Sequence, residues 1–325
     1  MELSIVIASW SAKDYLARCL RSFAEHPSRH SMEIIVVDNA SVDGSPEMVE
    51  ASFPDVRLIR NPRNMGFAKA CNIGIGQSSG AYVCLVNSDV VLSDRSVDVM
   101  YEYMQQNPAV GMVGPRFVGP DGELQMSCKS FPTLWNHLMS WLTLDRLFPS
   151  SRLFAGRHMT WFSHDEVRRV DVLAGTFWMI RRKVLEDVGL LDDRFFFYCE
   201  DLDWCKRCWQ AGWEVVFLPE AEIGHHHGAS SKRQPVRFYV QQHRSALRYW
   251  RKHHHPVAVF IIAANMLLHQ ALRVLVYTCA GGRRRSAPPA RRHKLERSVA
   301  CVRWLLGMHR DGNDDQPEDE GTRDA

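Results

Sequence analysis

The chain has 325 residues, of which 46% are hydrophobic and 24% are charged, and its formal net charge is +3. This composition fits a globular protein with ample core, one domain and an extension. The nine cysteines are odd in number and scattered along the chain. They exclude a disulfide framework and indicate reduced thiols in a cytosolic compartment.

The small net charge hides an uneven distribution along the chain. From Lys232 to Arg310 there are 17 Lys or Arg residues and a single acidic residue, Glu296. Seven acidic residues and one Arg follow Arg310, whereas the first 231 residues hold 29 acidic and 22 basic residues. An acidic body is therefore joined to a basic C-terminal region, which requires an anionic partner or surface.

Strand and helix patterns alternate through the first half of the chain. Continuous apolar runs predict buried strands over 3–8, 33–38, 56–60, 81–87 and 110–115. Apolar residues on one helical face predict helices over 14–23, 45–53, 68–76 and 96–106. Ser45 is predicted to be the N-cap of the second helix, with Pro46 at its first position. Buried strands separated by helices indicate an α/β fold with a parallel sheet.

The second half is less regular. Residues from about 120 to 164 are rich in Trp, Phe, Leu and Met. Order returns at 170–181, followed by a helix over 182–188, an acidic cluster at 200–203, a helix to 211 and a strand over 214–218. The apolar start without a basic leader predicts no signal peptide. The acidic residues from 312 onward are predicted to be disordered.

Five stretches occur in a fixed order: 4–7, 36–45, 64–68 with Asn72 and Gly74, 87–89, and 196–203. Together they resemble the family 2 inverting glycosyltransferases of the GT-A fold, within them the bacterial rhamnosyltransferase-like group. The resemblance covers about residues 3–231. It implies a Rossmann-like, mostly parallel sheet flanked by helices, with a C-terminal amphipathic helical extension. The expected organisation is a catalytic domain over 1–231, a basic helical extension over 232–310 and an acidic tail over 311–325.

A buried strand over 82–87 ends in a short turn that carries Asp89. Open α/β sheets bind ligands at the carboxyl ends of their strands, and a carboxylate there suits a divalent cation that phosphates also hold. The resemblance aligns Asn87, Ser88 and Asp89 with the family's Asp-x-Asp motif. It makes Asp89 the main Mn²⁺ or Mg²⁺ ligand and places Asn87 and Ser88 beside the nucleotide-sugar. Asn in place of the first Asp leaves open how tightly metal binds without donor.

The strand over 33–38 ends in Asp38, whose carboxylate could accept the imide N–H of a pyrimidine base. The resemblance implies this role, for uracil or thymine, with Asn39 beside it; the alternative is an Asx turn. Asn64, Gly66 and Phe67 form a loop that borders the nucleotide in the family. Gly66 would allow the backbone to pass close to a ligand or another loop.

Other loop residues carry weaker expectations. Arg63 or Lys69 could face the phosphates, and ordinary loop-to-helix punctuation is an equal alternative. Residues 172–177 resemble the family's segment beneath the acceptor and the donor sugar, where Gly175 would allow close approach. Asp192 and Arg194 are expected to be structural loop residues, although either could touch substrate.

Glu200 and Asp201 match the acidic pair that supplies the catalytic base in the family. An inverting transfer needs a carboxylate within reach of the attacking hydroxyl, so Asp201 is expected to be the base and Glu200 to orient the acceptor or the base. The alternative is an acidic helix N-terminus stabilised by the helix dipole, and both can hold.

His225 aligns with a family histidine that binds metal or diphosphate in some relatives, and imidazole suits Mn²⁺. His226 and His227 are expected to be surface histidines. A zinc site made by this cluster with Cys199, Cys205 and Cys208 is the disfavoured alternative. Cys205 and Cys208 lie in a predicted helix, and the sequence has no second pair of this spacing.

The segment 256–280 is long enough to span a bilayer. Asn265, His269 and Arg273 form a polar stripe along it, which favours a helix lying in the membrane interface with that stripe in water. Basic flanks suit anionic headgroups, and 299–308 is a second amphipathic piece. The alternative is a helix packed on the catalytic domain; nucleic-acid binding is disfavoured.

These observations predict an inverting, metal-dependent glycosyltransferase. The expected donor is a nucleoside-diphosphate sugar, dTDP-rhamnose first and UDP-sugars next, and the expected acceptor is a lipid-linked or polysaccharide glycan in cell-surface synthesis. The enzyme is expected in the cytoplasm, peripheral on the inner face of the cell membrane. The alternatives are an inactive GT-A scaffold or sugar-binding subunit, a processive synthase, and a nucleotidyltransferase. The last is disfavoured because no Gly-rich, Lys-bearing loop opens the chain.

Overall fold

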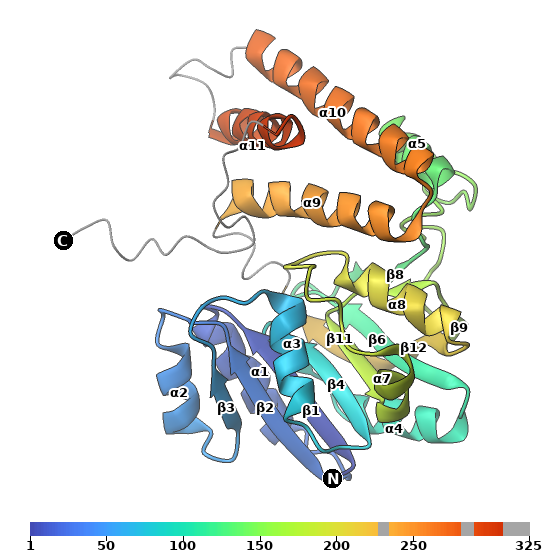
Figure 1. Ribbon diagram of the computed structural model, residues 1–325. Helices are drawn as coiled ribbons and strands as arrows, with labels where there is room; N and C mark the ends of the chain where they lie inside the picture. The colour runs from blue at the N-terminus through green and yellow to red at the C-terminus, as the bar shows by residue number, and fades with distance from the viewer. Residues whose placement is uncertain (227–233, 281–288, 308–325) are drawn as a thin grey trace, which may run out of the picture. The chain divides into compact units, whose positions relative to one another are not determined.

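The computed structural model of the protein describes residues 1–226, 234–280 and 289–307. The chain forms two compact units (Figure 1). The N-terminal unit comprises the residues up to Arg194 together with Glu200 and the chain that follows it through the last strand. The C-terminal unit comprises Phe195–Cys199 and the three helices at the end of the chain.

The N-terminal unit is built on one large mixed sheet. Its strands, with a separate short pair, are β1 (Leu3–Ser9), β2 (Met32–Asp38), β3 (Arg57–Arg60), β4 (Tyr82–Asn87), β5 (Val90–Leu92), β6 (Val110–Val118), β7 (Leu124–Gln125), β8 (Cys128–Lys129), β9 (Arg168–Arg169), β10 (Val172–Leu173), β11 (Phe177–Arg181) and β12 (Glu214–His225). The order is β3-β2-β1-β4-β11-β6-β12-β5, and β8 and β10 pair with each other outside it. Strands β1 to β4 are mutually parallel, whereas β11 runs antiparallel to both β4 and β6.

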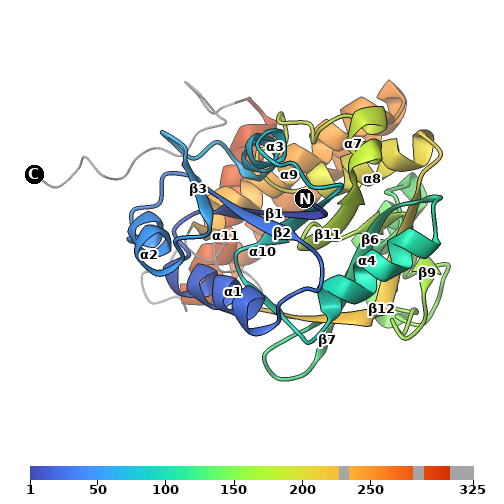
Figure 2. The same cartoon turned by 90° about the horizontal axis from the view of Figure 1, so that it is seen from below.

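Helices cover both faces of this sheet (Figure 2). The helices of this unit are α1 (Lys13–Glu25), α2 (Ser45–Ser52), α3 (Phe67–Gly76), α4 (Ser96–Gln106), α5 (Leu134–Trp141), α6 (Leu144–Leu147), α7 (Arg182–Val188) and α8 (Glu200–Gln210). Buried side chains of α1, α2 and α4 form one core with Ile5 and Ile7. On the opposite face α3 packs against β1 and β2. A Cβ at Gly74 would lie 2.3 Å from Val6 Cγ1, so only glycine permits this close approach.

Two sequence predictions in this unit need correction. Gly44, with φ +79°, is the N-cap of α2, and Ser45 is the first helical residue. The Ser45 hydroxyl donates to Asp43 Oδ1 at 2.5 Å, and no side chain caps the start of α2. The last strand continues to His225 instead of ending at Leu218. The strand contains a register shift between Leu218 and Glu222. Pro219 lies within this shift, where its lack of a backbone N–H does not interrupt a regular hydrogen-bond ladder.

The C-terminal unit contains α9 (Pro235–His253), α10 (Pro256–Cys279) and α11 (Pro289–Leu305). Gln270 of α10 is fully buried and donates to Tyr239 Oη of α9 at 2.7 Å. Arg273 Nε lies 3.3 Å from Ser298 Oγ of α11. The polar stripe was predicted to stay in water, but part of it forms hydrogen bonds between helices, because buried polar groups need partners.

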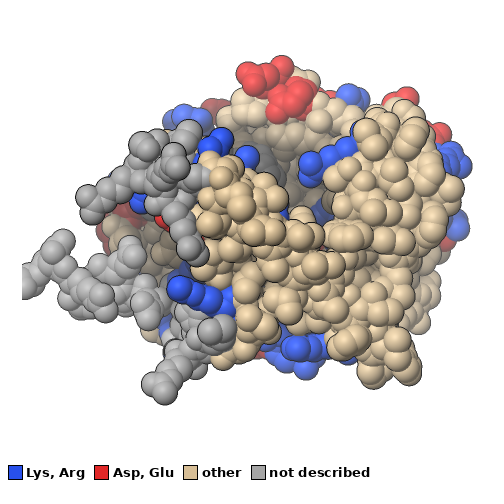
Figure 3. Space-filling view, turned by 90° about the horizontal axis from the view of Figure 1, so that it is seen from above, with Lys and Arg blue, Asp and Glu red and all other residues tan. Residues whose placement is uncertain are grey.

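The outer face of α10 is apolar instead. Its exposed large side chains are Val257, Phe260, Ile261, Leu268, Leu272, Leu275 and Val276. The view of the molecule in Figure 3 shows a face with few charged side chains over a broad area. Among the described residues, α10 is the one helix long and apolar enough to cross a membrane by length and composition.

Candidate functional site

The first part of the site lies at the carboxyl edge of the parallel strands. In the strand register Ser9 of β1 stands opposite Asp38 of β2, and Ala8 of β1 stands opposite Asn87 of β4. Asp38, Asn87 and the turn after Asn87 therefore end at one level of the sheet. This is the edge at which open α/β sheets hold their ligands.

Asp38 uses only one of its two carboxylate oxygens within the protein. Oδ2 accepts a hydrogen bond from the Ser41 backbone N–H at 2.9 Å, which is the turn that the sequence offered as an alternative. Oδ1 is buried and has no hydrogen-bond partner. Burial raises the pKa of Asp38 above its ordinary value. An unsatisfied acceptor inside a protein is costly, so this oxygen is suited to an N–H donor of a ligand.

The backbone around Asp38 is strained on both neighbouring loops. Ser11 has φ +47° and Ala40 has φ +58°, a region that non-glycine residues rarely occupy. The loops interlock, since the Ser11 N–H donates to Ser41 Oγ at 2.7 Å. Strain of this kind persists where the surrounding structure fixes it, as in binding sites.

The loop before α3 is fastened to the end of β2 by Asn39. Asn39 Oδ1 accepts from Asn61 Nδ2 at 2.9 Å, and Asn39 Nδ2 donates to the Gly66 carbonyl at 3.3 Å. Asn64 Oδ1 accepts from the Gly66 N–H at 2.9 Å, and Gly66 has φ +82°. Asn39 and Asn64 thus shape this loop, while Phe67, the first residue of α3, is nearly buried. Their contacts with a nucleotide stay predictions.

The sheet brings Asp89 and His225 together. Strand β5, which follows Asp89, pairs with the end of β12, so Val90 stands opposite His225. His225 Nε2 lies 3.5 Å from Asp89 Oδ1, and both side chains are nearly buried. Ser88, beside them, is also buried. The backbone N–H of His226 donates to the Asp89 carbonyl at 3.0 Å, and His226 is half-buried.

Gln125 orients the His225 ring. The Gln125 amide nitrogen donates to the His225 carbonyl at 3.1 Å, so its oxygen is the atom that lies 2.6 Å from His225 Nδ1. This oxygen accepts, which places the ring proton on Nδ1. In the neutral form of the ring, Nε2 is then the nitrogen that can bind a metal ion, and it lies on the side of Asp89. Metal-binding histidines are commonly held in this way by a second side chain.

A carboxylate next to the lone pair of an imidazole fits Mn²⁺ or Mg²⁺, with Mn²⁺ the better match to nitrogen. Among the described residues no group of three or more His, Cys, Asp or Glu side chains could hold a metal ion. Asp89 and His225 could serve as two protein ligands, and phosphate oxygens of a ligand would help to complete the shell.

Residues 174–176 connect this edge to a second acidic centre. The Asn87 N–H donates to the Thr176 carbonyl at 2.9 Å. A Cβ built on Gly175 would lie 3.6 Å from the Cβ of Asp201, an ordinary contact distance. Gly175 therefore lies between the turn that carries Asp89 and the N-terminus of α8.

The second centre contains Glu200, Asp201 and Lys129. Lys129 Nζ lies 3.5 Å from Asp201 Oδ2, and Glu200 Oε2 is buried without a hydrogen-bond partner. Burial first, and the negative charge of Asp201 second, raise the pKa of Glu200 to about 8. Glu200 is therefore protonated at neutral pH, whereas Lys129 balances the charge of Asp201. Two adjacent carboxyl groups in different environments can take different roles in proton transfer.

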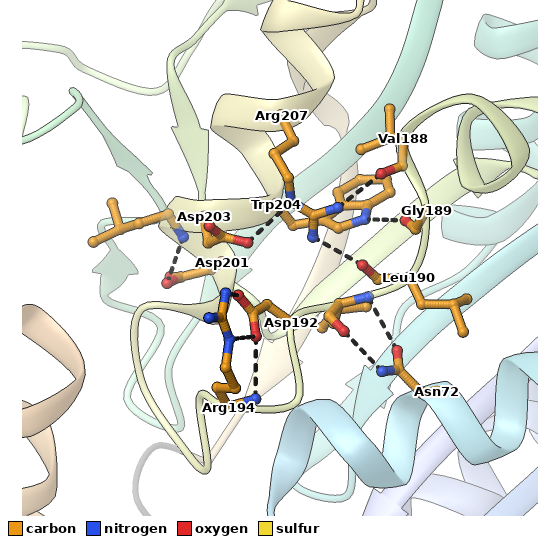
Figure 4. A network of polar contacts seen from close by, with 12 residues as sticks. Asn72, Val188, Gly189, Leu190, Asp192, Arg194, Asp201, Asp203, Trp204 and Arg207 are labelled. Carbon is orange, nitrogen blue, oxygen red and sulfur yellow. Dashed lines mark hydrogen bonds and ion pairs between the residues drawn. The ribbon is translucent and has the colours of Figure 1, made fainter. Parts of the chain in front are cut away.

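The loop before α8 is held by a polar network (Figure 4). Arg207 pairs with buried Asp203 at 3.0 Å and donates to the carbonyls of Val188 and Leu190, both at 2.8 Å. The Leu191 N–H donates to Asn72 Oδ1 at 3.0 Å. This network fixes the chain on the approach to Glu200 and Asp201.

The other loop residues singled out in the sequence all have contacts within the protein. Arg194 pairs with Asp192 through two hydrogen bonds of 2.9 and 2.6 Å, which accounts for both as structural residues. Lys69 pairs with Asp193 at 3.8 Å. Arg63 Nε lies 3.5 Å from Met65 Sδ. Neither contact tests whether these two basic side chains face phosphates, so that expectation and its alternative stay predictions.

The zinc alternative gains no support. Cys205 and Cys208 lie in α8, where burial raises the pKa of both thiols. Zinc binds the thiolate, and burial in apolar surroundings disfavours that form. His227, the last member of the proposed cluster, lies outside the described residues, as does the segment 228–230 of the aligned motif.

Sequence reasoning missed Lys129 and Gln125. Both come from the part of the chain that shows no clear period, and neither belongs to a recognisable motif. Lys129 reaches Asp201 because β8 pairs with β10, with Lys129 opposite Val172. Gln125 reaches His225 because β7 lies at the edge of β6, next to β12. Only these strand pairings reveal the two residues.

Comparisons with known proteins match this geometry. Residues 4–189 match the family "Glycosyl transferase family 2". An N-acetylglucosaminyl-diphospho-decaprenol L-rhamnosyltransferase of Mycobacterium tuberculosis is 30% identical over 254 residues, which span 75% of this chain and 82% of the relative. A dTDP-rhamnosyl transferase of Shigella flexneri is 27% identical over 240 residues, 70% of this chain and 74% of the relative.

Solved structures share the fold. A mannosyltransferase of Pyrobaculum calidifontis in complex with GDP-Man and Mn²⁺ has a TM-score of 0.55 and 16% identity, covering 95% of this chain and 88% of that one. S. aureus TarS in complex with UDP has a TM-score of 0.53 and 13% identity, covering 96% and 93%. The predicted GT-A fold, a mostly parallel sheet flanked by helices and followed by C-terminal helices, is confirmed.

Proposed function

Since this chain belongs to glycosyl transferase family 2 and is a glycosyltransferase, we propose that it moves a sugar with inversion from a nucleoside-diphosphate sugar to a hydroxyl of a lipid-linked or polysaccharide acceptor. The observation that carries the proposal is one connected site. The N-terminal unit contains all three parts of this site: the unpartnered oxygen of Asp38, the Asp89–His225 pair and the Glu200–Asp201–Lys129 cluster. Residues 174–176 link the Asp89–His225 pair to the Glu200–Asp201–Lys129 cluster. An inactive scaffold would not need to keep a protonated and a charge-balanced carboxyl group side by side.

The donor half of the site binds the nucleotide. Asp38 Oδ1 accepts the imide N–H of uracil or thymine, and the loop held by Asn39 and Asn64 borders the nucleoside. Asp89 and His225 would hold the divalent cation. When bound, the cation supplies Lewis-acid neutralisation of the charge that develops on the leaving diphosphate. Asn87, Ser88 and Gly175 lie beside this position and contact the donor sugar.

The acceptor half moves the proton. Asp201 takes the proton of the attacking hydroxyl, while that oxygen forms a bond to the sugar's anomeric carbon and the bond to diphosphate breaks. Such a single displacement inverts the anomeric centre. Protonated Glu200 donates a hydrogen bond that orients the acceptor, and the ammonium group of Lys129 lies beside the Asp201 carboxylate.

Rhamnose is the favoured sugar. Two relatives carry rhamnosyltransferase in their names, and one of them names dTDP. The carboxylate acceptor at Asp38 serves thymine and uracil equally, because both present the same imide N–H. UDP-sugars are therefore the next donors to test. Lipid-linked acceptors are favoured because the mycobacterial relative's name contains a diphospho-decaprenol.

The apolar face of α10 supports peripheral contact with the cytoplasmic face of the cell membrane. Exposed Arg251 and Lys252 lie at the end of α9, next to the start of α10. Apolar side chains flanked by basic ones match an interface with anionic headgroups. A lipid-linked acceptor would be met at this surface.

The first experiment is calorimetric titration of dTDP-rhamnose and a panel of UDP-sugars, with Mn²⁺ and with chelator. We expect selective binding of one donor that depends on metal. Transfer to a lipid-linked acceptor is then followed with that donor. Absence of binding by any donor to the folded, metal-supplied protein would overturn the proposal.

A further inference from the structure

A second exposed apolar surface lies in the N-terminal unit, on the segment that showed no period in the sequence. Between residues 134 and 153 seven large hydrophobic side chains are 40% to 66% exposed. They are Leu134, Trp135, Leu138, Leu142, Leu147, Phe148 and Leu153. We call this set the α5–α6 surface.

The local fold explains why these side chains point outward. Residues 134, 135, 138 and 142 fall on one side of a helical turn, whereas Asn136 and Met139 on the other side are buried. Thr133 and Asn136 form a capping box that fixes the start of α5. The Trp135 indole N–H donates to the Leu153 carbonyl at 2.9 Å. The apolar side chains are therefore presented by a segment with a capped helix and a hydrogen bond between its two ends.

The charged residues of this segment are mostly basic. Residues 131–162 contain three Arg and one acidic residue, Asp145. The Asp145 carboxylate accepts from Ser140 Oγ at 2.7 Å and is only partly exposed. Arg146 and Arg152 are exposed among the apolar side chains. The surface thus combines Trp, Phe and Leu side chains with exposed guanidinium groups.

We propose that the α5–α6 surface is a second membrane-docking site, which places the catalytic unit itself on an anionic lipid bilayer. Leucine and aromatic side chains enter the headgroup boundary, and the two arginines pair with lipid phosphates. A protein partner fits less well, since aromatic, aliphatic and basic groups without exposed acids are the composition of an interfacial lipid anchor. Large exposed apolar patches on soluble monomers mark interaction sites.

The α5–α6 surface is connected to the acceptor centre, which suggests why the protein would dock there. This step rests on the proposed function. Asp171 Oδ2 accepts from the Phe131 N–H at 2.9 Å, and Asn136 Nδ2 donates to the Phe131 carbonyl at 3.0 Å. These bonds fasten the start of α5 to the chain that carries Lys129, which contacts Asp201. Docking here would hold the acceptor centre next to the membrane that contains a lipid-linked acceptor.

The test measures flotation of the full chain with vesicles, one set of pure phosphatidylcholine and one with phosphatidylglycerol added. We expect binding to the anionic set, and a loss of at least about tenfold in L142E/L147E/F148E. V167E, a substitution at an exposed position outside the surface, is the matched control and should bind as the parent protein does. The variant F260E/L268E/L275E, measured in the same flotation experiment, tests the contribution of α10 separately.

A second measurement does not depend on the stability of the triple variant. Brominated lipids quench tryptophans that enter the bilayer, so W135F should lose part of the quenching seen in the parent protein. Unchanged vesicle binding by the folded triple variant would overturn the inference. A change of oligomeric state in that variant without a change in vesicle binding would assign the surface to a second copy of the chain and also overturn it. Vesicle binding needs no turnover, so inactivity toward every donor would count against the proposed function alone.

Discussion

The donor and acceptor halves of the site are built in different ways. In the donor half, Asp38 and Asp89 follow the ends of parallel strands, and Asp38 is held by Ser41, three residues further on. In the acceptor half, Asp201 is balanced by Lys129 from a distant, irregular segment. In the donor half, the local sequence at the strand ends positions the side chains. In the acceptor half, the charge of the base is balanced only once the complete fold has formed. Donor-half variants should change binding, and acceptor-half variants should change turnover.

The largest effect is expected for Asp201→Asn. Removing the proton acceptor should lower the rate of transfer by about 1,000-fold, the typical contribution of general-base catalysis. Donor affinity measured by calorimetry should stay within about twofold, because the substitution keeps the shape of the side chain. Asp193→Asn, at an exposed carboxylate of the preceding loop, is the control. Normal turnover in Asp201→Asn would show that the base has been assigned wrongly.

Asp89→Asn should affect the opposite half. Loss of the charged ligand should weaken metal-dependent donor binding on the order of 100-fold, since a bound cation contributes several kcal/mol at such a site. Donor binding in chelator should be unaffected. If turnover falls while metal-dependent donor affinity stays the same, the division between the two halves does not hold.

Gln125→Leu refines the donor half. Loss of the hydrogen bond to His225 Nδ1 frees the ring, and such outer-shell changes lower metal affinity by about 10-fold. A Mn²⁺ titration of donor binding measures the shift. Gln125→Glu should retain metal binding better, because its carboxylate still accepts from Nδ1. Equal loss in both variants would argue that Gln125 supports β12 and not the ring.

Lys129→Met tests the charge balance in the acceptor half. Without the ammonium group, the protonated form of the carboxyl pair is favoured, so the acid limb of the pH–activity profile should move up by about one pH unit. Lys129→Arg should restore the original profile. Because Lys129 is one-third exposed, solvent weakens the effect. A uniform loss of activity without a shift would indicate a structural role only.

Glu200→Gln gives the smallest effect and concerns stability. The folded-state pKa of Glu200, about 8, lies above its ordinary value of 4.5. Its contribution to stability is thus present below pH 4.5 and is lost as the pH rises through 8. Gln cannot ionise, so the Tm difference between variant and parent should grow in the variant's favour between pH 5 and pH 9. Glu186→Gln, at an exposed side chain, should show no such trend.

Most of the N-terminal unit could be predicted from the sequence. Apolar runs predicted β1, β2 and β4 closely, and the carboxyl ends of those strands supplied Asp38 and Asp89 as candidate site residues. Helices 96–106 and 182–188 were predicted with the bounds that the structure shows. Continuous apolar runs and the 3.6-residue repeat of amphipathic helices are properties of local sequence, so these elements can be predicted without the fold.

The C-terminal unit was less predictable. A helical extension was predicted over 232–310 without bounds for α9, and the polar stripe of α10 was expected to face water. In the structure Arg273 of that stripe and the neighbouring Gln270 bond to other helices. His269 stays exposed, while the large exposed side chains of α10 are apolar. An amphipathic pattern defines two faces of a helix but not which of them meets a partner, and α9 and α11 decided that here.

By itself, the sequence determined the family, the order of the strands that end in acidic residues, and the acidic pair at the start of α8. The tertiary structure decided which groups those carboxylates meet. It left Asp38 Oδ1 without a partner, set Gln125 behind His225, and brought Lys129 to Asp201. The physical reason is that a carboxylate's chemistry depends on burial and nearby charge, and both come from segments far away in the chain.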